Sequence, residues 1–133
     1  MRNRAGIILW CKPQKQVLLI KRIKNNAVYY VVAGGGVNEG ESFEAAAKRE
    51  LYEETGISAK KIRELAGLTT DRGYEKYYIS VVSDTHDVTI LGEELKRQSE
   101  LNRYIPEWVS LDKLNEVNLF PAELKKLIKR EFI

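Results

Sequence analysis

Three glutamates, Glu50, Glu53 and Glu54, are the residues of this chain whose type and spacing best suit chemistry. Residues at i, i+3 and i+4 share one face of a helix, with Cβ atoms about 5–6 Å apart. Two unit charges 4 Å apart repel by roughly 4 kcal/mol at an effective dielectric near 20. Ala46 and Ala47 lie one turn earlier and offer no positive side chain. We therefore expect a hard divalent cation, Mg²⁺ or Mn²⁺, to neutralise the carboxylates.

A fixed pattern surrounds these glutamates: glycine, five residues, Glu, seven residues, Arg-Glu-Leu, one residue, Glu-Glu, one residue and Gly-Ile. Its fixed positions are Gly35, Glu41, Arg49, Glu50, Leu51, Glu53, Glu54, Gly56 and Ile57. We interpret Gly35, Glu41 and Gly56 as residues that shape the loops around the helix. Arg49 is about 100° off the acidic face and could reach back to hold Glu41. An acidic helix face is usually only solvated, but this set spacing favours a metal site.

Local signals place the acidic residues on a helix at 43–54. Ser42 suits the N-cap, and Glu44 falls in the first turn, where the helix dipole favours an anion. The segment is rich in Ala, Glu, Lys and Leu, which are strong helix formers. Gly56 then ends the helix in a left-handed conformation. The carboxylates should therefore project from a rigid element.

The other elements follow from apolar alternation and from turn residues. Turns are predicted at 34–36 and 38–40, directly before the acidic helix. Strands are predicted at 4–10, 16–22, 28–32, 57–69, 76–83 and 108–110. A short helix is expected at 112–116 and a last helix at 121–133, because proline is tolerated in a first turn. The polar segment 84–103 is predicted to be a long loop, and such loops are usually functional or disordered. These elements predict an α/β fold in which a mixed sheet carries helices on both sides.

The segment 35–57 fills every fixed position of the signature of the Nudix hydrolase family, so the chain resembles MutT-like members of that family. Strand segments before the signature, and the late strand at 104–109, are also similar to family members. The resemblance implies one Nudix hydrolase domain over 1–133, folded as an α/β/α sandwich. Two positions depart from many relatives: Ala33 replaces a proline and Asn38 replaces a glutamate. Neither bears directly on the acidic turn.

The resemblance also implies an activity, which is Mg²⁺-dependent hydrolysis of a pyrophosphate bond in a nucleoside diphosphate linked to another group. By the same resemblance, Glu50 and Glu54 are the main metal ligands. Glu53 binds directly or through water and is sometimes the base, while the backbone carbonyl of Gly34 joins the shell. Metal ions neutralise phosphate oxygens and lower the pKa of bound water. The number of metal ions stays open.

The general base and the substrate-binding residues are less well defined by the sequence. Glu94, in the long polar loop, is the first candidate for the base, with Glu93 and Glu53 as alternatives and Glu100 as a weaker one. Arg4 and Arg22 could meet phosphates. Aromatic residues that could stack on a base, but more commonly pack the core of a sheet, are Tyr29, Tyr74, Tyr78 and Trp108. Trp10 is expected in the core, and His86 in a surface turn.

Composition limits the classes of function. A chain of 133 residues is expected to form one domain, and 44% hydrophobic with 31% charged residues is typical of a soluble globular protein. Nothing approaches the roughly 18 apolar residues of a membrane span. A lone cysteine, Cys11, excludes an internal disulfide and favours the cytoplasm.

A net charge of +3 favours phosphorylated substrates only mildly and is no nucleic-acid footprint. We therefore expect a small free nucleotide, such as a nucleoside triphosphate or its oxidised form, ADP-ribose, a nucleotide sugar or a dinucleoside polyphosphate, rather than the 5′ end of RNA. The alternative is a binding module that senses a nucleotide without cleaving it. A sensor has no need of three carboxylates, which favours the enzyme. Monomer and homodimer are both compatible with the sequence.

Overall fold

The computed structural model describes residues 2–71, 73–83 and 102–132. The strands are β1 (Arg4–Cys11), β2 (Gln16–Lys24), β3 (Ala27–Val31), β4 (Ala33–Gly36), β5 (Arg63–Thr70), β6 (Gly73–Val82) and β7 (Asn102–Ser110). The helices are α1 (Phe43–Thr55), the 3₁₀ helix η1 (Leu111–Glu116) and α3 (Glu123–Phe132).

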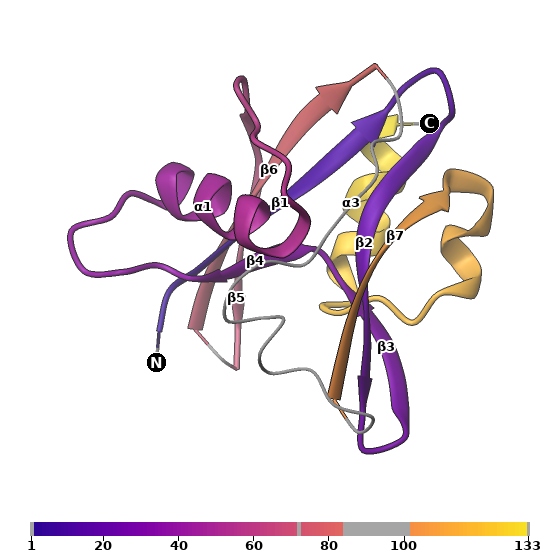
Figure 1. Cartoon of the computed structure of the whole chain (residues 1–133), viewed down its shortest axis with the longest axis horizontal. Helices are drawn as coiled ribbons and strands as arrows, with labels where there is room; N and C mark the ends of the chain where they lie inside the picture. The colour runs from indigo at the N-terminus through magenta and orange to yellow at the C-terminus, as the bar shows by residue number, and fades with distance from the viewer. Residues whose placement is uncertain (1, 72, 84–101, 133) are drawn as a thin grey trace.

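Strand β1 lies at the centre of the sheet, since β2, β4 and β6 all pair with it (Figure 1). β6 runs parallel to β1, and β5 adds antiparallel to β6. β2 carries β3 and β7 on its two sides, both antiparallel. The order is β3-β2-β1-β6-β5, with β4 on β1 and β7 on β2. The pairing therefore confirms the predicted mixed sheet.

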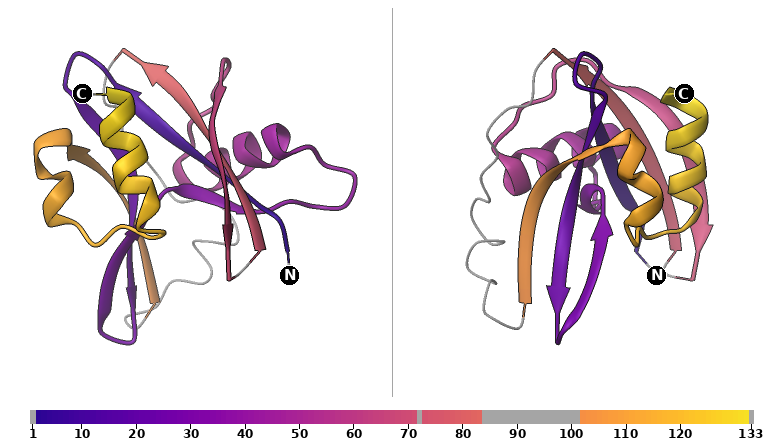
Figure 2. Two further views of the ribbon diagram at one scale, coloured as in Figure 1. Left: turned by 180° about the vertical axis from the view of Figure 1, so that it is seen from behind. Right: turned by 90° about the vertical axis from the view of Figure 1, so that its right-hand side faces the viewer.

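Helices α1 and α3 lie on opposite sides of this sheet (Figure 2, right). Successive side chains of a strand point to opposite faces, so β1 serves two cores. Ile7 and Leu9 pack in the core that includes α1, whereas Ile8 and Trp10 pack in the core that includes α3. The α/β/α sandwich is thus confirmed. Within the described residues, every helix is too short or too polar to cross a membrane.

The glycines before the acidic helix form a strand, so the turn predicted at 34–36 is wrong. β4 pairs antiparallel with β1, and Gly34 lies opposite Gly6. A Cβ on Gly34 would lie 2.4 Å from the carbonyl oxygen of Ala5, so only glycine permits this approach. The predicted turn at 38–40 is present, and Gly40 has a φ of 78°. The glycine run therefore places an extended strand, rather than a turn, beside the acidic helix.

Other boundaries differ from the sequence predictions. β5 begins only at Arg63. β7 begins at Asn102 and is much longer than expected. Pro106 is tolerated in it because the described part of the sheet places β7 at an edge, paired with β2. Helix α3 begins at Glu123, after Pro121 rather than at it. The segment 84–101 of the predicted loop lies outside the described residues.

Candidate active site

Helix α1 is set in place by the predicted caps. The side chain of Ser42 accepts a hydrogen bond from the backbone N–H of Ala45 at 3.1 Å. Gly56 has a left-handed φ of 77°, and its N–H donates to the carbonyl oxygen of Tyr52. Leu51 is fully buried against the sheet. With both ends and one face of the helix fixed, the backbone positions of its glutamates are fixed as well.

Strand β4 contacts two of the three glutamates directly. The backbone N–H of Gly34 donates to Oε2 of Glu54 at 3.0 Å, and Glu54 is only 8% exposed. A Cβ on Gly35 would lie 2.5 Å from Cδ of Glu50. Glycine at this position therefore leaves the space that the Glu50 carboxylate occupies. The two carboxylates converge on the backbone of one short strand.

Arg49 joins the loop, the strand and the acidic face. Its Nε and Nη2 donate to the two carboxylate oxygens of Glu41 at 2.8 and 3.0 Å, a bidentate pair. Nη2 also donates to the carbonyl oxygen of Gly36 at 3.0 Å. Nη1 donates to Oε1 of Glu50 at 2.9 Å and lies 3.4 Å from Glu53. The predicted link to Glu41 is confirmed. Arg49 also contacts the acidic face itself, because this long side chain bends around the helix.

Charge strengthens this junction. The Arg49 guanidinium, and secondarily the backbone N–H of Asn38 at 3.0 Å, lower the pKa of Glu41 to about 2. Hydrogen bonds from Arg49, first to Glu41 and then to Glu50, raise the pKa of the guanidinium above its usual value. Glu41 is therefore ionised throughout the physiological pH range. The loop before α1 is closed onto the helix by a permanent ion pair.

We call Glu41, Arg49, Glu50, Glu53 and Glu54 the acidic cluster. It holds four carboxylates and one guanidinium, and its oxygen donors suit Mg²⁺ or Mn²⁺. In the part of the chain that the structure describes, however, no three acidic, histidine or cysteine side chains converge closely enough to hold an ion alone. The donor set fits a cation held by two carboxylates and completed by a backbone carbonyl, water and substrate, which is the usual manner of Mg²⁺.

A cavity of about 490 Å³ opens beside the acidic cluster. Its volume is in the range of small-molecule sites. Within the acidic cluster, the residues that line it are Arg49, Glu50, Glu53 and Glu54. The glycines of β4 line it as well, and so do Arg22, Tyr29 and Tyr104 from β2, β3 and β7. Arg2 and Arg4, at the start of the chain, also line it. The guanidiniums of Arg2, Arg4 and Arg22 thus line the same cavity as the carboxylates, which suits a metal-bound polyphosphate.

Arg22 is held firmly in this wall. Its Nη2 donates to Oδ1 of Asn102 at 2.8 Å. Its guanidinium carbon lies 3.8 Å from the ring centroid of Tyr104 and 5.9 Å from that of Tyr29. Among the described residues, its buried Nε has no hydrogen-bond partner. A buried donor left unsatisfied costs about 1–3 kcal/mol, so a partner for this Nε would stabilise the site.

The structure brings together Arg4, Arg22 and Tyr29, which the sequence singled out, with the acidic cluster. Sequence reasoning missed Arg2 and Tyr104. Arg2 precedes Arg4 by two positions, a spacing that places side chains on one face of an extended chain, and this signal could have found it. Tyr104 has no comparable signal, since only the pairing of β7 with β2 brings it beside Arg22.

Other candidates lie elsewhere. Trp10 and Tyr78 are buried in the two cores, and Trp108 packs against one of them, as expected for strand aromatics. Tyr74 packs edge-on against Phe43, with ring centroids 5.7 Å apart. His86, Glu93, Glu94 and Glu100 lie outside the described residues.

Comparison with known proteins decides the family. The family model described as the NUDIX domain matches residues 1–130. The chain belongs to this family. It is 31% identical over 125 residues to an RNA pyrophosphohydrolase of Actinobacillus pleuropneumoniae serotype 5b, covering 94% of this chain and 54% of that protein. It is 42% identical over 69 residues to one of Pelagibacter ubique, covering 51% of this chain and 43% of that protein. The chain thus spans about half the length of the curated relatives it matches.

Solved structures agree on the fold. The NUDIX domain of Shewanella oneidensis NrtR, complexed with ADP ribose, superposes with a TM-score of 0.75 at 19% identity, covering 100% of this chain and 89% of that one. A Caenorhabditis elegans Ap4A hydrolase gives 0.71 at 20%, covering 96% and 93%. A MutT from a study of Aliivibrio salmonicida and Vibrio cholerae gives 0.69 at 22%, covering 97% and 93%. At these identities the likeness shows the fold alone, and the Nudix fold is confirmed.

Proposed function

We propose that this protein is a divalent-metal-dependent pyrophosphohydrolase that cleaves a nucleoside diphosphate linked to another group. One observation carries the proposal: Glu50, Glu53 and Glu54, the backbone of β4 and four arginines all line the same cavity. Pyrophosphate hydrolysis needs this combination, because an anionic phosphorus must be approached by a nucleophile while its charge is neutralised. Membership of the NUDIX family supports the proposal.

Two glutamates are proposed to hold the cation. Glu50 and Glu54, which both contact β4, would bind Mg²⁺ or Mn²⁺ together with the carbonyl oxygen of Gly34. When bound, the cation would neutralise phosphate oxygens and acidify a water. Arg49 donates hydrogen bonds to Glu41 and Glu50 at the same time and so keeps the Glu50 carboxylate in place.

The remaining roles fall to residues around the cavity. Arg2 and Arg4, which also line the cavity, are proposed to bind substrate phosphates. The side chain of Glu53 is 46% exposed, the most open among the carboxylates that Arg49 contacts. Glu53 is therefore proposed to accept the proton of an attacking water. Glu94 and Glu93 remain alternative bases outside the described residues. Arg22 and its two tyrosine neighbours are proposed to hold the nucleoside.

We propose a small free nucleotide as the substrate, because a cavity of about 490 Å³ can hold a nucleotide and the net charge is only +3. The second candidate is the 5′ end of RNA. It is favoured by the curated relatives, which are named RNA pyrophosphohydrolases. Both candidates present the same chemistry to the site, a nucleoside 5′-polyphosphate.

The test is phosphate and pyrophosphate release with Mg²⁺ from nucleoside triphosphates, ADP-ribose, nucleotide sugars, dinucleoside polyphosphates and a 5′-triphosphorylated oligonucleotide. Glu54→Gln should lose most turnover and keep the fold. Glu44→Gln is the matched control, since it removes the same charge from an exposed position in the first turn of the same helix.

The outcome separates the candidates. Turnover of a free nucleotide supports the first substrate, and turnover of the oligonucleotide alone supports the second. Near wild-type activity in Glu54→Gln would refute the assigned site. Nucleotide binding without turnover of any compound would favour the sensing module instead.

A further inference from the structure

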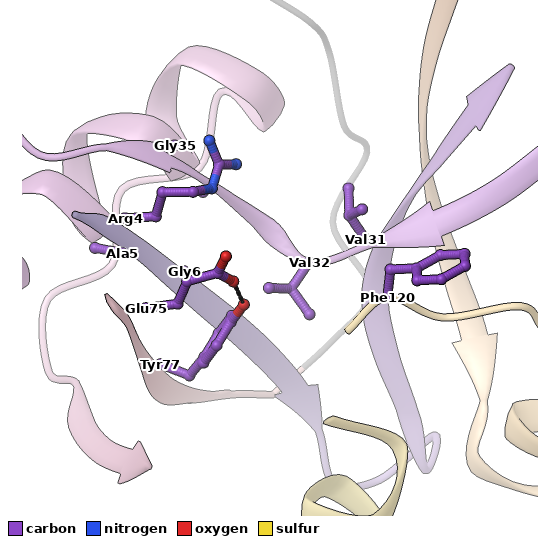
Figure 3. Close-up of a pocket in the computed structure, with 10 residues that line it drawn as sticks. Arg4, Ala5, Gly6, Val31, Val32, Gly35, Glu75, Tyr77 and Phe120 are labelled. Carbon is purple, nitrogen blue, oxygen red and sulfur yellow. Dashed lines mark hydrogen bonds between the residues drawn. The ribbon is translucent and has the colours of Figure 1, made fainter. Parts of the chain in front are cut away.

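A second, much smaller pocket of about 30 Å³ adjoins the active-site cavity (Figure 3). Arg4, Gly34 and Gly35 line both spaces, so the two are neighbours across β4. The small pocket also contains Glu75, a carboxylate on β6 that is only 1% exposed. Buried carboxylates are held by hydrogen bonds or ion pairs, so the groups around Glu75 indicate its role.

Two hydroxyl groups hold the Glu75 carboxylate in position. Oγ1 of Thr70 donates to its Oε2 at 3.2 Å, and the hydroxyl of Tyr77 donates to its Oε1. A Cβ on Gly6 would lie 2.8 Å from two ring atoms of Tyr77. Gly6 therefore lets the ring lie across β1 and reach the carboxylate. The dashed line in Figure 3 marks that hydrogen bond.

Among the described residues, Arg4 is the cation that lines this pocket. Arg4 and Glu75 are register partners on the adjacent parallel strands β1 and β6, which places their side chains on the same face of the sheet. Both line the small pocket (Figure 3). A phosphate would be repelled by the Glu75 carboxylate, so the pocket itself is a poor phosphate site. Its volume has room for about two water molecules, because one water needs roughly 10–15 Å³.

We propose that Glu75 is a positioning residue for substrate binding. Its carboxylate attracts the Arg4 side chain across the small pocket, through water, and keeps the guanidinium turned toward substrate phosphate in the active-site cavity. This inference rests on the proposed phosphate-binding role of Arg4. The competing explanation is purely structural: Glu75 would only tie Thr70 and Tyr77 together within the β5–β6 hairpin.

Steady-state kinetics of four proteins separates the two explanations: wild type, Glu75→Gln, Arg4→Gln and the double variant. Glu75→Gln should raise KM about tenfold, the order expected for a lost charge-assisted contact, with kcat nearly unchanged. Because Glu75 acts through Arg4, the double variant should be no worse than Arg4→Gln. A structural role would lower Tm and leave KM unchanged, and that result overturns the proposal.

Two further variants test the positioning role of Glu75. Tyr77→Phe keeps the ring over Gly6 and removes the hydroxyl, so it should also raise KM. This variant provides a test if Glu75→Gln folds poorly. Glu64→Gln is the matched charge control on β5; Glu64 pairs with Lys76 at 3.1 Å and lines neither pocket. It should leave KM unchanged. Additive effects of Glu75→Gln and Arg4→Gln on KM would overturn the proposal.

Binding of Mg²⁺–pyrophosphate, measured by calorimetry, distinguishes failure of this inference from failure of the proposed function. If wild type turns over no nucleotide, the proposed function fails, and the same four proteins are compared for this binding alone. Weaker binding in Glu75→Gln only when Arg4 is present supports the positioning role. Equal affinity in all four proteins overturns it.

Discussion

Replacing Gly35 by alanine tests the contact between β4 and the acidic helix. The new Cβ would lie 2.5 Å from Cδ of Glu50 and 2.6 and 2.7 Å from its two carboxylate oxygens. Ordinary van der Waals contact begins at 3.4 Å. The carboxyl group must therefore withdraw by the difference between 3.4 and 2.5 Å, about 0.9 Å.

The displacement should cost activity rather than stability. The clashing atoms are the far end of a flexible side chain, so Glu50 can rotate away while the fold persists. The stability loss should be about 1 kcal/mol, mainly from the hydrogen bond that Arg49 donates to Glu50. A misplacement of about 1 Å in a catalytic group can lower the rate about 100-fold. Gly35→Ala should thus lower kcat by about 100-fold and raise the Mg²⁺ concentration needed for half-maximal activity.

Gly34→Ala is the paired comparison, because its Cβ meets backbone. It would lie 2.4 Å from the carbonyl oxygen of Ala5 and 2.7 Å from Cα of Gly6, neither of which can rotate away. The β4–β1 pairing must open, and overpacking of this kind costs about 1–3 kcal/mol or more. Thermal unfolding and kinetics of both variants give the comparison.

Two results would refute the reasoning. Wild-type kcat in Gly35→Ala would show that the position of the Glu50 carboxylate against β4 is not required for turnover. A loss of stability in Gly35→Ala equal to that of Gly34→Ala would show that the clash cannot be relieved by a side chain.

Three further predictions concern stability. Because the pKa of Glu41 is lowered to about 2, the stabilisation of the fold by its carboxylate is present above the ordinary value of 4.5 and is lost as pH falls toward 2. Glu41→Gln should therefore lower Tm at pH 7, and the difference in Tm from wild type should shrink between pH 4.5 and 2. A difference in Tm that does not depend on pH would contradict this. Burial, and then the hydrogen bond to Glu107 at 2.8 Å, raise the pKa of Tyr30 from 10.0 to about 12. The stabilisation by Tyr30 is therefore present below pH 10 and lost as pH rises through 12. Burial also raises the pKa of Tyr78, so ultraviolet titration should show more than one high-pH tyrosine, and Tyr30→Phe should remove one tyrosine from that phase; an unchanged phase would contradict the assignment. Changing Ile128, which is fully buried on α3, to alanine should lower the free energy of unfolding by about 2–5 kcal/mol and leave KM unchanged. A shifted KM would link this core to the active site.

Local sequence was enough to predict the parts of the site that depend on neighbours along the chain. Helix α1 follows from the Ser42 cap, the helix formers after it and Gly56 at its end, and all three are observed. The shared face of Glu50, Glu53 and Glu54 follows from helical spacing. The link from Arg49 to Glu41 was also foreseen, because a bidentate pair of this type spans only a short loop. The family pattern, confined to one segment, identified the fold in the same way.

Tertiary structure decided what depends on pairing between distant segments. The glycines of β4 look like a turn in the sequence, and only their pairing with β1 makes them a strand against Glu50 and Glu54. Tyr104 contacts Arg22, and Glu75 lies beside Arg4 in the small pocket, because of strand registers that no local pattern encodes. Helical spacing fixes neighbours within one turn, whereas a sheet joins residues far apart in sequence. The acidic residues were therefore readable from the chain, but the cavity they face was set by the packing of the strands.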